Sequence, residues 1–546
     1  MTDYALTEAI ASAVGLEPAE REAVRRLVTI WRDKLPRNEL RDRYYLSHVP
    51  ANDLGVSVSP ELASRIDARV DWPAKAVDYL AARSQFDGFS ADDPETQARL
   101  LAIASRNSLG SLYRKALVCE LKHCCAALAV TSDALGRAVV SAYPMTACAL
   151  EWDDAQKEVA RGLVVAESRP TYPGSATREP SVVKLFTAGA VVTMRKGPGG
   201  AWSASREEIA MGRPLIEPMA YRATLERPFG RSRITRAVMS IADDAMREKV
   251  RSEIAAEFAA YPQKYLMGTD QRMIPQDSRY AAYIGAILEV TKGDDGTVPS
   301  FGQLPQISMQ PHVEYMRALA AQFSGATNVP LSALGVVSDN PSSAEAIYAA
   351  KEDLVIEAQE LNKANGRALV NVATLALATE LNVPFSSVRD SGAEIVADFR
   401  SPAMPSVVSQ SDAMVKQISV LPWLAESDVA LEELGYDEAK RRRLASDRAK
   451  AQSRALVAQA TAGTGLSVAG NPDGAGDANE GISSPPPSEP EGEARNGGLN
   501  GAQTQSMIGV IQSYQAGALT EGQAVNVLSV AIGVSKEKAR GLLSGE

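Results

Sequence analysis

The clearest pattern of apolar and polar positions lies between residues 231 and 261. Apolar side chains recur there at helical spacing, with some drift in the second half, at Ile234, Val238, Ile241, Ala245, Val250, Ile254 and Phe258. Charged side chains of both signs alternate along the rest of the surface. This periodicity predicts one long amphipathic helix that Pro262 ends. The segment PHVEYMRALAAQFSGA predicts a second helix over 311–326.

Helical and strand-like patterns alternate through the rest of the first 460 residues. Helices are predicted as a pair over 1–46, from near Pro73, as a pair over 93–122, and over 406–460, where Ser427 begins a helix and Gly435 ends it. Strands are predicted in HCCAALAVTSD, in the Val- and Thr-rich region over 143–230, and in AEIVADFRSP. The run KGPGG at 196–200 is typical of a β-hairpin turn. The predicted fold class is therefore α+β, mainly helical.

A loop of about fifteen residues follows the helix over 311–326. Loops of that length without their own structure are uncommon, and they are usually functional or disordered. The stretch from Ala318 to Ser338 carries no charged side chain. Ser342 and Glu345 form a capping box that begins a helix running to about Leu381, with Gly366 as a candidate kink. Taken alone, the loop could be a substrate lid or a flexible connector.

The region after residue 460 changes in composition. Residues 461–502 are rich in Gly, Ser and Pro and mildly acidic, which predicts a disordered linker that buries no core. Residues 503–546 recover apolar periodicity, with a capping box at Thr520 and Gln523, and predict a small helical module. The 546 residues are enough for about three or four domains.

Charge and cysteine usage narrow the function classes. The net charge is −10, whereas a protein that grips DNA through its phosphates carries a basic surface. Contact with DNA is therefore expected to be loose or confined to a local patch. The four cysteines predict reduced thiols, because their spacing fits neither a disulfide framework nor a zinc site. No run of about eighteen uncharged apolar residues is present, so no membrane-spanning helix is expected.

Two clusters could in principle carry chemistry. His123, Cys124 and Cys125 would combine a thiolate with a base, but neighbours on a strand point to opposite faces, so core packing is favoured for the two cysteines. Asp294 and Asp295 in the run GDDG could hold a metal ion. The run lacks the spaced ligands of a calcium loop, so a plain turn is favoured.

Two further clusters are charged. Asp243 and Asp244 could act as paired acids, but neighbours on a helix diverge, and a solvated face with an ion pair from Asp243 to Arg247 is favoured. The run KRRR at 440–443 could bind nucleic acid, but acidic residues flank it, so a solvated helix face is favoured. No phosphate-binding loop, nucleophile elbow or CxxC motif is present. The residues therefore predict no enzyme, no cofactor and no metal site, and they favour a role in assembly, structure or binding.

The segment from residue 216 to about residue 270 resembles a known family. It reads IEPMAYRATLERPFGRSRITRAVMSIADDAMREKVRSEIAAEFAAYPQKYLMG and is similar to the portal (head-to-tail connector) proteins of long-tailed bacteriophages. In that family a turn like PFGRSRI leads into a long helix that ends in a segment like YPQKY. Similar matches occur in KLPRNELRDRYYLSH, in the segment from FGQLPQ to AQELN, and in LAESDVALEELGYDEAKRRR. The ordered set covers about residues 30–460.

The resemblance implies a ring, typically of twelve subunits, around a central channel at one capsid vertex. It implies a wing over 1–230, a stem helix over 231–264, a clip over 265–308 and a second stem helix over 309–326. It also implies a tunnel loop over 327–341, a long spine helix with a return to the wing over 342–403, and a crown over 404–460.

The resemblance also implies site residues in three of these parts. In the tunnel loop the candidates that face DNA are Asn328, Val329, Leu331, Ser332, Ser338, Asp339 and Asn340, and the helix cap of Ser342 and Glu345 anchors them. On the stem helix the residues expected to meet a neighbouring subunit or the channel are Arg236, Asp243, Asp244, Arg247, Glu248 and Arg251. In the clip the expected contacts are Asp294 and Asp295.

The implied function is a DNA channel through which a terminase packages the genome and from which the genome is later ejected. The implied partners are further copies of the chain, double-stranded DNA held weakly, the terminase large subunit, the head-completion adaptor, and the major capsid and scaffolding proteins, with no membrane. The implied location is the portal vertex of the virion, after assembly in the host cytoplasm. Two alternatives remain open: a structural adaptor or scaffold of the virion without a channel and, less favoured, an enzyme such as a nuclease or protease.

Overall fold

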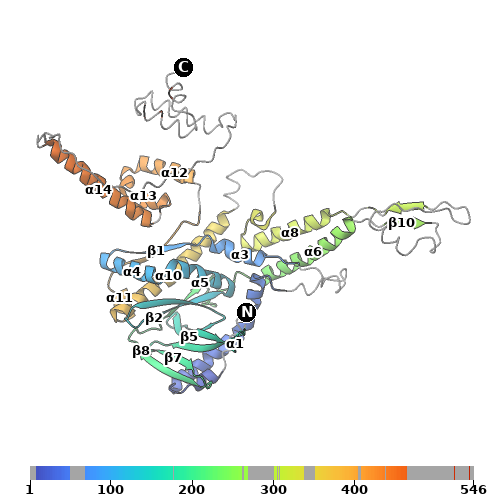
Figure 1. The fold of residues 1–546 in the computed structure, drawn as a ribbon, viewed down its shortest axis with the longest axis horizontal. Helices are drawn as coiled ribbons and strands as arrows, with labels where there is room; N and C mark the ends of the chain where they lie inside the picture. The colour runs from blue at the N-terminus through green and yellow to red at the C-terminus, as the bar shows by residue number, and fades with distance from the viewer. Residues whose placement is uncertain are drawn as a thin grey trace, which may run out of the picture. The chain divides into compact units, whose positions relative to one another are not determined.

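The computed structural model describes residues 8–49, 68–175, 177–260, 264–267, 300–303, 305, 308–336, 351–403, 407–436 and 438–463, and three single positions nearer the C-terminus. The chain divides into two compact units, Met1–Gln452 and Ser453–Glu546. Nearly all described residues belong to the first unit, and Figure 1 shows its helices and strands.

Helices make up most of the described residues, as the sequence predicts. The longer ones are α1 (Pro18–Tyr45), α3 (Trp72–Ala81), α4 (Pro94–Arg106), α5 (Leu109–His123), α6 (Arg236–Ala260), α8 (Gln310–Thr327), α10 (Glu352–Leu381), α12 (Val407–Val420) and α14 (Glu438–Gly463). The shorter ones are η1 (Glu8–Ser12), η2 (Leu331–Leu334), α11 (Phe385–Arg389), η3 (Pro422–Glu426) and α13 (Asp428–Glu433). The two long helices predicted over 231–261 and 311–326 are confirmed by α6 and α8.

The N-terminal region differs from the predicted pair of helices. A single long helix, α1, follows the short turn η1 and continues through Pro36. A proline in a helix interior removes one backbone hydrogen bond and costs about 3 kcal/mol or more. Trp31 and Tyr44, on either side of Pro36, are both buried. Tertiary packing on both sides therefore holds α1 together where the local sequence favours a break.

The strands form two larger sheets, both antiparallel. The first has the order β3-β2-β9, from β2 (Cys125–Ser132), β3 (Ala138–Pro144) and β9 (Ile216–Ala220). The second has the order β4-β5-β6-β7-β8, from β4 (Cys148–Asp153), β5 (Glu158–Pro170), β6 (Arg178–Phe186), β7 (Ala190–Lys196) and β8 (Trp202–Glu208). Lys196 pairs with Trp202 where β7 meets β8, which confirms the predicted hairpin turn.

The main core surrounds β2. Its residues from Cys125 to Val130 are buried without alternation, which is typical of a strand covered on both faces. Helices α5 and α10 pack on its sheet, and β5 of the other sheet approaches β9. A Cβ atom on Gly162 of β5 would lie 3.0 Å from the Ile216 side chain on β9. Glycine at this position lets the two sheets approach each other.

A second core joins α1 to the five-stranded sheet. Leu27 and Trp31 on α1 pack with Leu163 and Met194 from β5 and β7. The Trp31 Nε1 atom donates a hydrogen bond to the Thr146 carbonyl oxygen at 2.9 Å. Burial of this apolar face fixes α1 on the sheet, and Trp31 also lines a cavity beside the helix.

Helix α10 crosses the main core as one uninterrupted helix through Gly366, the candidate kink. It packs on β2, β9 and β12 (Ile395–Phe399), and the predicted strand in AEIVADFRSP is confirmed by β12. Strand β12 pairs with β1 (Phe86–Ala91). A Cβ atom on Gly366 would lie 3.5 Å from the Phe399 ring, so the small residue brings α10 close to β12.

The helices after residue 406 agree with the predicted caps. The Ser427 Oγ atom accepts a hydrogen bond from the Val429 backbone N–H at 3.2 Å, at the start of α13. Gly435 follows the end of α13 with a φ of 82°. Helix α14 continues to Gly463, slightly beyond the predicted start of the linker. From residue 464 onward, the linker and the helical module lie outside the described residues apart from the three single positions.

A small hairpin completes the described elements of the first unit. Strand β10 (Lys264–Met267) pairs antiparallel with β11 (Ser300–Gln303). Among the described residues, no helix has the length and apolar character needed to cross a bilayer. Within the same ranges, no group of three or more His, Cys, Asp or Glu side chains is placed to hold a metal ion.

Candidate functional site

Helices α6 and α8 lie side by side (Figure 1). The predicted tunnel loop begins where α8 ends, at Thr327. A polar pair joins the two helices: the Glu248 carboxylate on α6 lies 2.6 Å from the His312 Nδ1 atom on α8. Glu248 is buried, with 4% of its surface exposed. Its carboxylate is therefore used within the chain, contrary to the expectation that it meets a neighbouring subunit or the channel.

The remaining charged positions of α6 have different surroundings. The Tyr44 hydroxyl donates a hydrogen bond to the Asp243 carboxylate at 2.8 Å, so this acid faces α1. Arg247 forms its ion pair with Asp244 at 3.2 Å, and the pair predicted with Asp243 is not the one formed. Arg236 is exposed. Burial raises the pKa of Asp243, with a smaller opposing effect from the Tyr44 hydrogen bond.

Arg251 approaches the buried Glu248 at 4.0 Å. The six predicted α6 positions therefore do not form one exposed row. Asp243 and Glu248 point into contacts with other parts of the same chain, whereas Arg236 remains at the surface.

The segment after α8 starts with a fixed turn. Asn328 adopts a left-handed conformation with a φ of 54° and ends α8. Asparagine is one of the few non-glycine residues that adopt this conformation readily. The next residue, Val329, has no exposed surface, so it anchors the segment in the core and does not face DNA as the sequence suggested. The burial follows from the turn at Asn328, which directs the chain back against the core.

The segment becomes accessible only after Pro330. Residues Leu331–Leu334 form the short helix η2, which the sequence did not predict, and Gly335 follows with a φ of 83°. Ser332 is exposed, and 39% of Leu331 is exposed. Ser338, Asp339, Asn340, Ser342 and Glu345 lie outside the described residues, as do Asp294 and Asp295. The described part of the loop thus presents neutral side chains at η2.

A buried arginine fixes the base of this segment. Arg233 has 5% of its surface exposed. Its guanidinium donates hydrogen bonds to the Glu357 carboxylate and to the carbonyl oxygens of Thr327 and Ala76. It also donates to the Tyr221 hydroxyl at 2.9 Å. One side chain therefore connects the start of α6, the end of α8, α10, α3 and the residue after β9.

Glu357 is the acidic partner at the centre of these contacts. Its carboxylate accepts hydrogen bonds from the Tyr221 hydroxyl and, at 3.2 Å, from the Asn328 side-chain amide. Arg222 lies 3.1 Å from the same carboxylate. Burial alone would raise the pKa of Glu357, but Arg233, the Tyr221 hydroxyl and Arg222 outweigh it and lower the pKa. We call Arg233, Glu357, Tyr221 and Asn328 the loop anchor.

The turn before Arg233 depends on one glycine. Gly230 has a φ of 71°, and a Cβ atom there would lie 2.1 Å from the Tyr221 carbonyl oxygen. The following Arg231 backbone N–H donates to that same oxygen at 2.9 Å. Only glycine fits this approach. The PFGRSRI segment is thus a tight turn that delivers Arg233 into the core.

Sequence reasoning missed Arg233, Glu357 and Tyr221 as anchor residues. A local signal existed for Arg233, because it lies inside the PFGRSRI segment, directly before the apolar stripe of α6. No local signal marked Glu357 on α10, since its carboxylate is 124 residues away from Arg233 in the sequence. The sequence identified the loop but not its support.

No protein-family profile matches the chain. The portal protein of Mycobacterium phage D29 is 24% identical over 440 residues, which cover 76% of this chain and 86% of that protein. The portal protein of Mycobacterium phage L5 is 23% identical over 423 residues, which cover 74% of this chain and 83% of that protein.

Solved structures with similarity include the neck of an empty GTA particle. That chain has a TM-score of 0.41 and 14% identity, covering 70% of this chain and 94% of its own length. A chain from the virion of a native gene transfer agent particle has a TM-score of 0.38 and 13% identity, covering 70% of this chain and 89% of its own length. These two portal proteins confirm the resemblance seen in the sequence: over about three quarters of its length this chain is similar to phage portal proteins.

Proposed function

We propose that this chain is the portal protein of a bacteriophage, the subunit of a ring that forms the DNA channel at one capsid vertex. The observation that carries the proposal is the sequence relationship to two portal proteins over three quarters of the chain. The genome would be packaged through the ring by the terminase and later ejected through it. Head-completion and tail proteins would attach to the same ring.

The described elements are compatible with the parts expected of a portal subunit. Helices α6 and α8 would form the stem, and the β10–β11 hairpin would belong to the clip that meets the terminase and the adaptor. Elements before residue 231, together with β12, would build the wing. Helices α12, α13 and α14 would form the crown. Asp294 and Asp295 remain proposed clip contacts.

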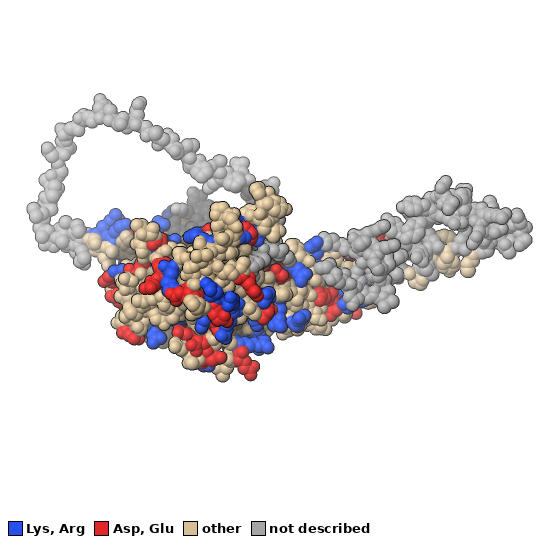
Figure 2. Space-filling view, turned by 90° about the horizontal axis from the view of Figure 1, so that it is seen from below, with Lys and Arg blue, Asp and Glu red and all other residues tan. Residues whose placement is uncertain are grey.

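The neutral segment after α8 supports a sliding contact with DNA. A channel that lets DNA move must avoid strong phosphate binding, because each phosphate neutralised by Lys or Arg adds salt-dependent affinity. From Ala318 to Ser338 the chain carries no charge, and η2 presents Leu331 and Ser332 at the surface. Figure 2 shows charges of both signs interspersed over the visible described surface, without one large basic area.

The loop anchor supports a mechanical role for this segment. A loop that contacts moving DNA needs a base that does not move with it. Arg233 holds the Thr327 carbonyl oxygen, and Glu357 holds the Asn328 amide. Arg233 lies just before α6 and Glu357 lies on α10, and the two side chains bind each other. A force on η2 would therefore pass to these two long helices. The loop would thus be mounted on the rigid part of the subunit.

Assembly into a ring requires surfaces that meet head to tail. Arg236 on α6 is exposed and available for such a contact. We propose a closed ring of about twelve copies, located at the portal vertex of the virion after assembly in the host cytoplasm. Capsid and scaffolding proteins would contact its outer surface.

Negative-stain electron microscopy of the purified full-length protein tests the proposal. Class averages are expected to show closed rings with a central hole, and light scattering should give one mass near the corresponding multiple of 58.1 kDa. Imaging at several salt and protein concentrations excludes a simple failure to assemble. Monomers or solid bundles under all conditions would contradict the proposal and favour an adaptor without a channel.

A further inference from the structure

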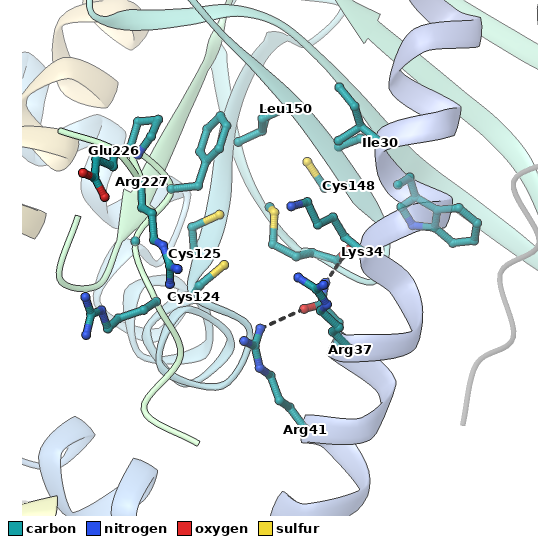
Figure 3. Close-up of a pocket in the computed structure, with 18 residues that line it drawn as sticks. Ile30, Lys34, Arg37, Arg41, Cys124, Cys125, Cys148, Leu150, Glu226 and Arg227 are labelled. Atoms are coloured by element: carbon teal, nitrogen blue, oxygen red, sulfur yellow. Dashed lines mark hydrogen bonds between the residues drawn. The ribbon is translucent and has the colours of Figure 1, made fainter. Parts of the chain in front are cut away.

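A cavity of about 450 Å³ opens beside α1, and the buried side chains of Trp31 and Asn38 form part of its wall. Its lining comes from α1, from the junction of α5 and β2, and from the turn before Arg233. Figure 3 shows Lys34, Arg37 and Arg41 on α1 facing the side chains of Cys124 and Cys125 across this cavity. The portal function proposed above assigns no role to these residues.

The cavity is strongly basic. Lys34, Arg37, Arg41, Arg227 and Arg231 line it, against one acidic residue, Glu226. Arg41 donates hydrogen bonds to the His123 carbonyl oxygen at 3.0 Å and to the Asn38 side chain at 3.2 Å. Within the described ranges, Lys34, Arg37, Arg227 and Arg231 form no ion pair with an acidic side chain. Unpaired cations around a concave site favour an anionic ligand.

Cys124 occupies an unusual position between α5 and β2. The sequence suggested a strand, in which Cys124 and Cys125 would point to opposite faces. Cys124 instead ends α5 with a φ of 96°, in the left-handed region that favours glycine. This turn lets both thiols reach the same cavity. Cys125 is buried, which confirms its packing role, whereas Cys124 is half-buried.

The surroundings stabilise the Cys124 thiolate. The neighbouring Cys125 side chain is the largest cause, burial opposes it, and the charges on Arg41 and Lys34 add to it, so the pKa of Cys124 is lowered to about 7. The thiolate is the reactive form of cysteine. Burial raises the pKa of Cys119 and of Cys148, and Cys125 is held as a thiol by Cys124 and by burial. Among the four cysteines, only Cys124 combines a lowered pKa with access to a cavity.

We propose that this cavity is a reactive-thiol site for small anionic disulfides, with Cys124 as the nucleophile. The cations of α1 and of the 227–231 turn would bind the carboxylates of the incoming disulfide. The Cys124 thiolate would attack one sulfur of the R–S–S–R molecule. A bond forms between Cys124 and that sulfur, the original S–S bond breaks, and the second half leaves as R–S⁻, so no further oxidant is needed. The product is a mixed disulfide that fills the basic cavity.

Two opposing factors set how much faster Cys124 attacks a disulfide than an ordinary thiol does. A pKa near 7 raises the thiolate fraction at pH 7 roughly tenfold over an ordinary thiol, but the lower basicity takes back part of that gain in nucleophilicity. The remaining advantage comes from charge attraction, which depends on the charge of the reagent and on salt. Comparing the rates of an anionic and a neutral disulfide therefore distinguishes attraction by the basic cavity from simple exposure of the thiol.

The test compares two disulfides on the full-length protein at pH 7. Dithiobis(nitrobenzoate) is anionic and dithiodipyridine is neutral, and peptide mass mapping identifies the first cysteine modified. We expect Cys124 to react first with the anionic reagent, at a rate that salt reduces. The double variant Lys34→Gln with Arg37→Gln should lower the anionic rate roughly threefold to tenfold and leave the neutral rate nearly unchanged.

Two controls keep the outcome decisive. Arg25→Gln changes an exposed arginine on α1 that pairs with Glu22 and does not line the cavity, and it should change neither rate. Cys124→Ser should abolish the fast phase, whereas Cys119→Ser should retain it. First modification at Cys119, or equal loss of rate with both reagents in the double variant, would overturn the proposal. Mass mapping on the unmodified sequence gives this answer even if a variant fails to fold.

Discussion

The guanidinium of Arg233 and the carboxylate of Glu357 form an ion pair in the protein interior, with 5% and 6% of the two residues exposed. The pair joins the turn before α6 to α10 across 124 positions of sequence. It also holds the end of α8, because Arg233 binds the Thr327 carbonyl oxygen and Glu357 binds the Asn328 amide. The base of the neutral loop is therefore fixed by charges that the local sequence does not place together.

Replacement of Arg233 by Met should destabilise the first unit by about 3–5 kcal/mol, because it leaves the Glu357 carboxylate buried and partly unpaired. The measurement is urea unfolding at a fixed protein concentration. As a control, Arg222→Gln removes the half-exposed partner of the same carboxylate and should cost about 1 kcal/mol or less.

A double variant separates the ion pair from simple packing. The double variant Arg233→Met with Glu357→Leu removes both charges. The decrease in its free energy of unfolding should therefore be smaller than the sum of the decreases in the two single variants. The recovery is only partial, since the carbonyl oxygens of Ala76 and Thr327 still lose their donor. Strict additivity of the two changes would show that the residues do not act as a pair.

Glu120 should make the folded protein less stable as pH rises. It is fully buried, and burial raises its pKa to about 8, although a hydrogen bond from the Asn365 amide opposes this. Between its ordinary pKa of 4.5 and about 8 the folded state holds one more proton than the unfolded state. Its contribution is therefore fully present below pH 4.5 and is lost through pH 8, at up to about 1.4 kcal/mol per pH unit.

Glu120→Gln provides the test, since it keeps the shape and cannot ionise. Urea midpoints measured at pH 5, 6, 7 and 8 should fall less steeply in this variant than in the unmodified protein. Glu22→Gln, at an exposed position on α1, should keep the original slope. An unchanged slope in Glu120→Gln would assign the pH dependence to other groups.

Ser332→Lys should slow or stall DNA packaging while rings still form. The added cation lies at the exposed part of η2, and each new phosphate contact adds salt-dependent affinity for DNA. Packaged DNA per particle in a complementation assay is the measurement. Asn328→Lys is a poorer choice, because Asn328 also bonds to Glu357. Ser111→Lys, on the exposed side of α5, controls for the added charge, and full packaging with Ser332→Lys would place η2 away from DNA.

Removal of residues 462–546 should leave ring assembly intact. The first compact unit ends at Gln452, and residues 461–502 are rich in Gly, Ser and Pro. Electron microscopy of the truncated protein should show the same rings as the full chain. If rings disappear while the truncated protein still unfolds cooperatively, the C-terminal residues take part in assembly.

The sequence predicted those features whose signal is local. The apolar stripe of α6, the cap at Ser427, the hairpin turn after Lys196 and the buried strand β2 each depend on neighbours within a few positions, and each is confirmed. Predictions were wrong where contacts between residues distant in the sequence determine the local structure. Helix α1 continues through Pro36, Val329 turns into the core, and Cys124 ends a helix with a left-handed backbone where a strand was expected.

The sequence by itself determined the helical periods, the absence of charge from Ala318 to Ser338, and a resemblance to portal proteins that the relatives confirm. Only the tertiary structure decided which charges are buried and with whom. It placed Arg233 on Glu357, Glu248 against His312, and Cys124 beside the cations of α1. The physical reason is that periodicity records the preferences of one element, whereas ion pairing and thiol reactivity depend on low-dielectric contacts between elements far apart in the chain.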